Sequence, residues 1–192
     1  VLLGVFPLVA KKIVDVIKAR KVYAKWAHLK PKSFDRNLVV IGAGAAGLVT
    51  SYIAAVVKAK VTLVEAHKMG GDCLNYGCVP SKALIKTATL AKQIRHSSDY
   101  GIAKASAEID FAQVMERVAG VVRAVEPHDS VERYTSLGVD VVIGNAKITS
   151  PWHVEITGED GAKRTLSTRS IVIATGAAPF VPPLPGLNDV GF

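Results

Sequence analysis

The sequence predicts an α/β fold of three layers, in which a small antiparallel β meander is inserted before the last strand of a mainly parallel sheet. An apolar run at residues 37–41 leads through a glycine-rich turn into an apolar helix that ends near residue 57. Further apolar runs follow at residues 60–64 and 170–174. Strands that alternate with helices in this way are typical of a parallel sheet covered by helices.

The positive charge of the chain is concentrated at its N-terminal end. The formal net charge is +8, but residues 1–36 contain nine Lys or Arg and two Asp, a net of +7, which leaves +1 for residues 37–192. A nearly neutral globular part gives no support to nucleic-acid binding. The two cysteines are too few for a secreted disulfide framework, and they fit a catalytic pair in the reducing cytoplasm better.

The first 36 residues combine an apolar start with a basic amphipathic segment. Residues 1–10 are mostly apolar, and we read them as the tail of a transmembrane helix. Residues 11–36 hold all nine basic side chains, with apolar residues at helical spacing, which favours a juxtamembrane helix at the cytoplasmic face of a membrane. The alternative is a solvated helix that packs one apolar face against the domain.

A Gly-x-Gly-x-x-Gly motif follows the first predicted strand. It comprises Gly42, Gly44 and Gly47, with Ala45 and Ala46 between the last two glycines. Gly42 allows a tight turn, Gly44 lets the backbone approach a pyrophosphate, and Gly47 lets the helix and strand pack closely. Amide groups at the start of the helix would face the phosphates.

An acidic residue ends the second predicted strand. Glu65 lies eighteen residues after Gly47, where its carboxylate would accept hydrogen bonds from ribose hydroxyls. A glycine-rich turn with no ligand is the competing interpretation. Because strand, glycines, helix, second strand and acid occur in order, the sequence predicts a dinucleotide site.

Both cysteines lie in one short stretch, which reads Gly-Gly-Asp-Cys-Leu-Asn-Tyr-Gly-Cys-Val-Pro-Ser-Lys over residues 70–82. On a regular helix, Cα atoms five positions apart are about 8–9 Å from each other, whereas a disulfide needs roughly 4.4–6.8 Å. Joining Cys73 to Cys78 therefore requires a deformed turn, which Gly77 and Pro80 would allow. A bridge around so small a loop adds little stability, so chemistry explains it better. The competing interpretation is two reduced cysteines on a core helix.

This stretch resembles the redox-active disulfide motif of the class I pyridine-nucleotide–disulfide oxidoreductases. These flavoproteins include dihydrolipoamide dehydrogenase, glutathione reductase and mercuric reductase. The resemblance implies an FAD-binding, Rossmann-like domain over residues 37–178. It also implies that Cys78 is the charge-transfer thiol beside the flavin, that Cys73 is the interchange thiol that meets the substrate, and that Lys82 lies near the flavin N5.

The resemblance adds two more residues to the cofactor site. Gly71 is implied as an FAD contact, together with both thiols and Lys82. Asp72 stands where relatives often have Thr, and its carboxylate would repel a pyrophosphate unless it turned away or were hydrogen-bonded. We include Asp72 in the site without a role. Thiols in the first turns of a helix, with Lys82 nearby, have an environment that lowers a thiol pKa.

The segment between the cysteines and the next strand is predicted to be helical. Apolar spacing predicts one helix over residues 81–97. Asp110 is the expected N-cap of a second helix that extends to residue 125. Pro127 allows a break, after which the helix resumes to about residue 137.

The last third of the domain is predicted to be strands. Residues 139–143 form one strand, and residues 146–167 form the short antiparallel strands of the meander. The resemblance implies that Ala146 lies at the adenine end of FAD. It further implies that Thr175 and Gly176, in the turn after the last strand, pack against the cofactor.

The resemblance also implies parts that these 192 residues do not supply. Residues 179–192 read as a connector towards an NAD(P)H domain, but no second Gly-x-Gly-x-x-Gly motif follows. The C-terminal dimerisation domain of the family is missing too. We therefore expect a homodimer for the full-length protein and no turnover by these residues alone.

Together these features predict, for the parent protein, an FAD-dependent NAD(P)H:disulfide-type oxidoreductase, similar to mercuric reductase or dihydrolipoamide dehydrogenase. Electrons would pass from NAD(P)H through FAD to the Cys73–Cys78 disulfide, and then to a small-molecule disulfide, thiol or Hg(II). Two alternatives stay open: a membrane-tethered flavin redox module without disulfide reductase turnover, and a catalytically silent FAD-binding fragment. No resident metal site is predicted.

Overall fold

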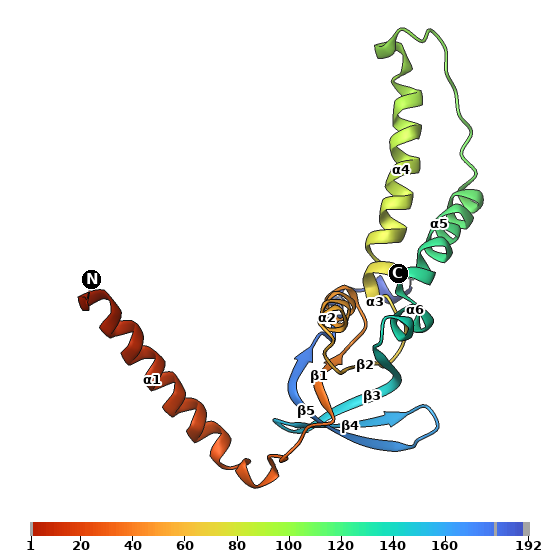
Figure 1. Cartoon of the computed structure of the whole chain (residues 1–192). Helices are drawn as coiled ribbons and strands as arrows, with labels where there is room; N and C mark the ends of the chain where they lie inside the picture. The colour runs from red at the N-terminus through yellow and green to blue at the C-terminus, as the bar shows by residue number, and fades with distance from the viewer. Residues whose placement is uncertain (1, 179, 190–192) are drawn as a thin grey trace.

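The computed structural model describes residues 2–178 and 180–189, although not the side chains of residues 2–6, 8 and 188. Val1, and Pro179 and residues 190–192 of the predicted connector, lie outside the described residues. The body of the protein is a sheet with helices on one side and a β meander on the other (Figure 1). The three-layer α/β prediction is confirmed.

A four-stranded parallel sheet forms the middle layer, in the order β5-β1-β2-β3. The strands are β1 (Arg36–Ile41), β2 (Val61–Glu65), β3 (Asp140–Ser150) and β5 (Lys163–Ile173). Because β1 is paired on both sides, its N–H and C=O groups are satisfied and its apolar side chains are buried on both faces.

Alternation of side chains along the strands divides the core into two clusters. Val40 of β1 and Leu63 of β2 face helix α2 (Ala45–Val56), where they pack with Leu48. Their neighbours Val39 and Val64 face the opposite side and pack on the meander. The uninterrupted apolar runs of these strands follow from this burial, since both faces are covered.

The meander is an extension of the main sheet, and here the expectation of separate short strands is wrong. Strands β3 and β5 each run without a break from the parallel sheet into an antiparallel pairing with β4 (His153–Gly158), so that the five strands close a ring. Gly144 lies where β3 passes from β2 to β4, and a Cβ there would collide with the Thr157 carbonyl. The absent side chain lets the strand continue through this bend.

Most of the remaining helices come between β2 and β3 in the chain. Among them, α4 and α5 project from the body of the protein as a long hairpin (Figure 1). The Asp110 side chain accepts a hydrogen bond from the Gln113 N–H, which confirms the predicted N-cap of α5. The elements are α3 (Gly71–Asn75), α4 (Cys78–Arg95), η2 (Ser97–Tyr100), α5 (Phe111–Val125), η3 (Glu126–Asp129), α6 (Val131–Ser136) and, near the C-terminus, η4 (Leu187–Asp189).

The N-terminal segment forms helix α1 (Leu2–Ala24) and a short helix η1 (Ala27–Leu29). Helix α1 thus includes the apolar residues before position 11 together with the first part of the basic segment 11–36. The described apolar side chains of α1, such as Ile13 at 54% exposure, are open to solvent, so the alternative of an apolar face packed on the domain is wrong.

The end of α1 nevertheless contacts the turn between β3 and β4. The Tyr23 and Trp152 ring centroids are 5.8 Å apart, and Lys30 lies 5.8 Å from the Trp152 ring. The Ser167 N–H and hydroxyl also donate to the Asp35 carboxylate, at 2.9 and 2.7 Å. These hydrogen bonds join the segment between η1 and β1 to strand β5. Within the described residues, no helix is long and apolar enough to cross a membrane.

An ion-pair network lies at the amino ends of the parallel strands β1, β2 and β3. Asp140 Oδ2 accepts hydrogen bonds from Arg36 and Arg164, each at 2.8 Å, and from Thr62 at 2.9 Å. Burial raises the pKa of the Asp140 carboxyl, but these three donors outweigh it and leave the pKa below its usual value of 3.8.

We expect Asp140→Asn to lower the free energy of unfolding at pH 7 by about 1–2 kcal/mol, because charged hydrogen bonds are lost at a partly exposed site. A pKa that is lower in the folded than in the unfolded chain stabilises above the unfolded pKa, and this contribution is lost as the pH falls through the folded value. Urea unfolding at pH 7 and about pH 3 should therefore show the variant and the wild type converging in acid. The exposed Asp15→Asn is the control; a variant that matches it at pH 7 would contradict the network.

Candidate functional site

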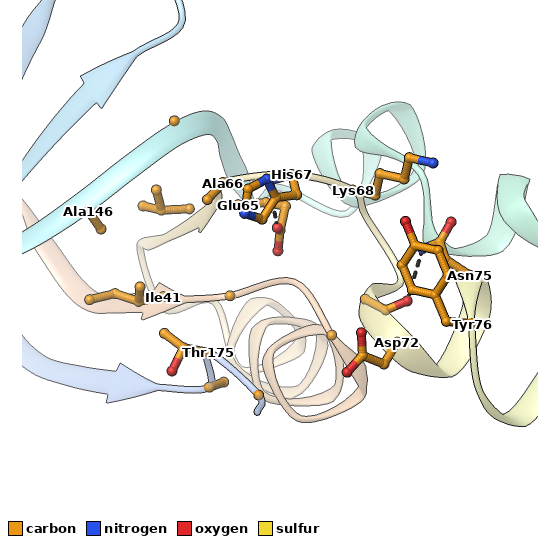
Figure 2. A pocket seen from close by; sticks show the side chains of 17 residues that line it. Ile41, Glu65, Ala66, His67, Lys68, Asp72, Asn75, Tyr76, Ala146 and Thr175 are labelled. Carbon is orange, nitrogen blue, oxygen red and sulfur yellow. Dashed lines mark hydrogen bonds between the residues drawn. The ribbon is translucent and has the colours of Figure 1, made fainter. Parts of the chain in front are cut away.

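A cavity of about 440 Å³ opens at the carboxyl ends of the parallel strands, the edge at which open α/β sheets bind ligands (Figure 2). Its walls come from the turn after β1, the end of β2, helix α3, the bend of β3 and the turn after β5. The lining residues are Ile41, Gly42, Gly44, Val64, Glu65, Ala66, His67, Lys68, Gly71, Asp72, Asn75, Tyr76, Gly144, Ala146, Ala174, Thr175 and Gly176.

The glycine motif is shaped by close backbone approaches. A Cβ on Gly47 would collide with the Gly42 carbonyl, so α2 can start directly against the turn only without a side chain there. A Cβ on Gly71 would lie 2.7 Å from the Gly44 Cα. The start of α3 therefore packs directly on the glycine turn, and two segments of bare backbone meet beside the cavity.

Glu65 holds these segments together. Its Oε2 accepts the Ala43 N–H at 2.6 Å and its Oε1 accepts the His67 N–H at 2.8 Å, while the residue is only 8% exposed. Each carboxylate oxygen can accept a second hydrogen bond. Glu65 can thus fix the turn after β1 and still present acceptors to a ligand in the cavity that it lines.

The cysteine stretch is two helices with a break, which is the deformed turn that the spacing requires. Helix α3 ends at Asn75, helix α4 starts at Cys78, and the N–H groups of Tyr76 and Gly77 both donate to the Asp72 carbonyl, at 2.9 and 2.6 Å. A Cβ on Gly77 would lie 3.0 Å from that carbonyl oxygen, at the limit of what a side chain tolerates. The prediction of one helix starting at residue 81 is thus wrong by a few residues.

In the structure Cys73 and Cys78 are both thiols, which is the reduced form of the disulfide that the resemblance implies. A hydrogen bond between the two side chains, followed by burial, raises the pKa of the Cys73 thiol, and Lys82 opposes the rise more weakly. The expectation of a lowered thiol pKa is therefore wrong for Cys73. The reason is that Cys78 and burial favour the neutral Cys73 thiol more strongly than the Lys82 cation favours its thiolate.

The cavity brings together eight residues of the predicted cofactor site, from five segments of the chain. They are Gly42, Gly44, Glu65, Gly71, Asp72, Ala146, Thr175 and Gly176. Six others do not line it: Ala45, Ala46, Gly47, Cys73, Cys78 and Lys82. Ala45, Ala46 and Gly47 form the first turn of α2, and the last three follow on α3 and α4.

Sequence reasoning missed four residues that line the cavity. His67 lies beside Glu65, and Lys68, Asn75 and Tyr76 lie together at one end of the cavity (Figure 2). Asn75 Nδ2 donates to the Met69 and Gly71 carbonyls at 3.0 and 2.9 Å and so fixes this turn. The sequence offered one indication of their role, since all four lie between Glu65 and Cys78, two residues already predicted for the site.

The cavity fits the diphosphate and ribose part of a dinucleotide. Five glycines line it, so backbone is exposed where side chains would otherwise fill the space. The first-turn N–H groups of α2 have no partner within the helix and can donate to phosphate oxygens. The site is thus that of a dinucleotide-binding domain, and Cys73 is the next residue in the chain after the lining residue Asp72.

Comparison with known proteins agrees with this class. Residues 36–192 match the family profile described as pyridine nucleotide-disulphide oxidoreductase, and the chain belongs to this family. The family is one of FAD-dependent oxidoreductases. The resemblance stated from the cysteine stretch is therefore confirmed.

The similar proteins include dihydrolipoyl dehydrogenases and a mercuric reductase. The chain is 35% identical to dihydrolipoyl dehydrogenase of Acholeplasma laidlawii, across 82% of this chain and 45% of the relative. It is 36% identical to dihydrolipoyl dehydrogenase of Mycoplasma pneumoniae, across 80% and 32%. It is 30% identical to mercuric reductase of Staphylococcus aureus, across 82% and 28%. The chain thus spans less than half the length of these curated relatives.

We expect Glu65→Gln to weaken the fold around the cavity, because the new amide group must turn one N–H towards a backbone N–H. The cost of leaving one buried donor without its acceptor is about 1–3 kcal/mol of unfolding free energy. Amide hydrogen exchange at Ala43 and His67 should accelerate, and urea unfolding should shift. The exposed Glu159→Gln should change neither; equal behaviour of both variants would contradict the role of Glu65.

Proposed function

We propose that the chain is the FAD-binding part of an NAD(P)H-dependent oxidoreductase whose redox centre is the Cys73–Cys78 pair. The observation that carries the proposal is the position of the thiols. Cys73 lies in α3 and Cys78 begins α4, on the two sides of the break, and Gly71 and Asp72 of the same α3 line the dinucleotide cavity. A ligand that reaches beyond this wall would meet the dithiol.

The residues proposed to hold FAD fall into three groups. The first-turn amides of α2 and the glycines approach the diphosphate, Glu65 accepts from the ribose, and the bends of β3 and β5 border the rest. They are Gly42, Gly44, Ala45, Ala46, Gly47, Glu65, Gly71, Asp72, Ala146, Thr175 and Gly176, with Cys73, Cys78 and Lys82 beyond them. Bound there, FAD supplies a two-electron carrier that a nicotinamide can reduce.

The chemistry proposed for the chain itself is thiol–disulfide exchange. The disulfide form takes up two electrons and two protons to give two thiols. The Cys73 thiolate then attacks a substrate disulfide, forms a mixed disulfide and releases one substrate thiolate. The Cys78 thiolate attacks Cys73 Sγ, which releases the second thiolate and restores the internal disulfide.

The division of roles between the two thiols depends on the cofactor. In the structure Cys78 is exposed and Cys73 is half-buried, the reverse of what a substrate thiol at position 73 would require. A flavin ring lying against the start of α4 would cover Cys78 and leave Cys73 as the accessible thiol. This is the arrangement that we propose.

The whole protein is proposed to be a homodimer that acts on a small disulfide, a dithiol or Hg(II). The support is the names of the relatives, dihydrolipoyl dehydrogenase and mercuric reductase. These relatives are two to four times longer than the matched part, and NAD(P)H would bind in a domain outside these residues. The isolated chain is accordingly proposed to bind FAD without turnover.

A second proposal concerns helix α1, which we infer lies on the cytoplasmic surface of a membrane with anionic lipids. Its apolar Val9, Ile13, Val16 and Ile17 are exposed, and residues 1–36 carry a net charge of +7. Such a helix buries apolar side chains at the lipid interface while its lysines pair with headgroups. The contacts of Tyr23 and Lys30 with Trp152 support a fixed position of the domain relative to this surface.

The redox proposal is tested on the full-length protein by anaerobic titration with about one two-electron equivalent of reductant. A long-wavelength charge-transfer band should appear while the flavin remains oxidised. Cys78→Ser should keep FAD and lose the band, because the thiolate beside the flavin is gone; Cys73→Ser should keep both. A band that survives in Cys78→Ser would contradict the assigned roles, and absence of FAD from the wild type would contradict the function.

The membrane proposal is tested by sedimentation with vesicles. The chain should bind vesicles of phosphatidylserine and phosphatidylcholine, and not vesicles of phosphatidylcholine alone. Lys18→Glu with Lys21→Glu on α1 should weaken binding at least about tenfold, since each basic residue near the surface contributes about 1 kcal/mol. Lys92→Glu with Lys104→Glu, outside α1, is the matched control; an equal loss in both pairs would show that α1 is not the binding element.

A further inference from the structure

The cavity contains more negative than positive charge before any ligand enters. Glu65 and Asp72 both line it, and a bound diphosphate adds about two further charges. The N-terminus of α2 offsets only about half a charge. Among the described residues no ion pair neutralises Asp72, whose side chain is exposed in the first turn of α3.

Lys68 is the only lysine or arginine among the described residues that line this cavity. Its Nζ lies 5.8 Å from the centroid of the Tyr76 ring, which is itself 70% exposed. A cation over an exposed ring is held only weakly. The Lys68 ammonium group can therefore leave the ring for an anion in the cavity. The distance is short, because Tyr76 lines the same cavity.

The backbone fixes Lys68 and Asp72 in one rigid turn. The Gly71 N–H donates to the Lys68 carbonyl at 3.2 Å, and the Gly70 N–H donates to the Ala43 carbonyl at 2.9 Å, which joins this turn to the glycine motif. In Figure 2 the side chains of Lys68, Asp72 and Tyr76 gather at the same end of the cavity.

We propose that Lys68 neutralises the diphosphate site against Asp72 and thereby sets its affinity for a dinucleotide. The inference rests on the proposed function, since it assumes that a dinucleotide binds in this cavity. When the cavity is empty, the Lys68 ammonium group lies over the Tyr76 ring. The Asp72 carboxylate repels the phosphates, and the Lys68 ammonium group compensates for this repulsion.

The test measures affinity for FAD, by quenching of flavin fluorescence, and for ADP, by calorimetry, because ADP contains the diphosphate and lacks the flavin. At low ionic strength Lys68→Met should weaken both about tenfold. At about 1 M salt the loss should shrink severalfold, because charges in water are screened over about 3 Å. Asp72→Asn should tighten binding, and the double variant should return to within about threefold of the wild type.

The control is Lys92→Met, which removes a lysine on α4 that does not line the cavity. Equal affinities of Lys68→Met and Lys92→Met for ADP and FAD would overturn the inference and leave the proposed function intact. A wild type that binds neither ligand would overturn both. A loss confined to FAD would place Lys68 at the flavin and would also overturn a role at the diphosphate.

Discussion

The Glu65 carboxylate is the interaction on which the site depends. It accepts the Ala43 N–H after β1 and the His67 N–H after β2, and so joins two turns that the sequence separates by more than twenty residues. Without this acceptor, two backbone donors beside the cavity would be left unsatisfied, which a folded chain avoids. The same buried carboxylate presents its remaining acceptors to the cavity. One side chain therefore shapes the site and contributes to its chemistry.

The thiol pair shows how a departure from regular secondary structure serves chemistry. A continuous helix would hold Cys73 and Cys78 too far apart for a disulfide. Both N–H groups at the break bond to the Asp72 carbonyl, so the chain turns without losing its hydrogen bonds. The neighbouring Cys78 and burial raise the pKa of the Cys73 thiol, and α3 connects Cys73 to the cavity wall. The short helix α3 thus contains one of the two thiols and part of the cavity wall.

Most of the fold could be predicted from local patterns, and the errors have a common cause. The strand and helix around the glycine motif and the Asp110 cap follow from apolar periodicity and capping chemistry. The continuity of β3 and β5 did not, because no local pattern shows that a strand of the parallel sheet and a strand of the meander are one strand until β4 pairs with the outer half. Likewise, Lys68 and Tyr76 carry no motif of their own, and they became site residues only when the turn before α3 folded against the glycines.

The sequence by itself determined the class of fold, the glycine turn, the acid at the end of β2 and the cysteine pair, because each depends on residues close together in the chain. The family match over residues 36–192 agrees with those motifs. Only the tertiary structure decided which residues face one cavity and that Glu65 accepts hydrogen bonds on both oxygens. It also decided that, among the described residues, Lys68 is the one lysine that lines the cavity with Asp72. These features depend on contacts between segments distant in sequence, and local propensity contains no information on such contacts.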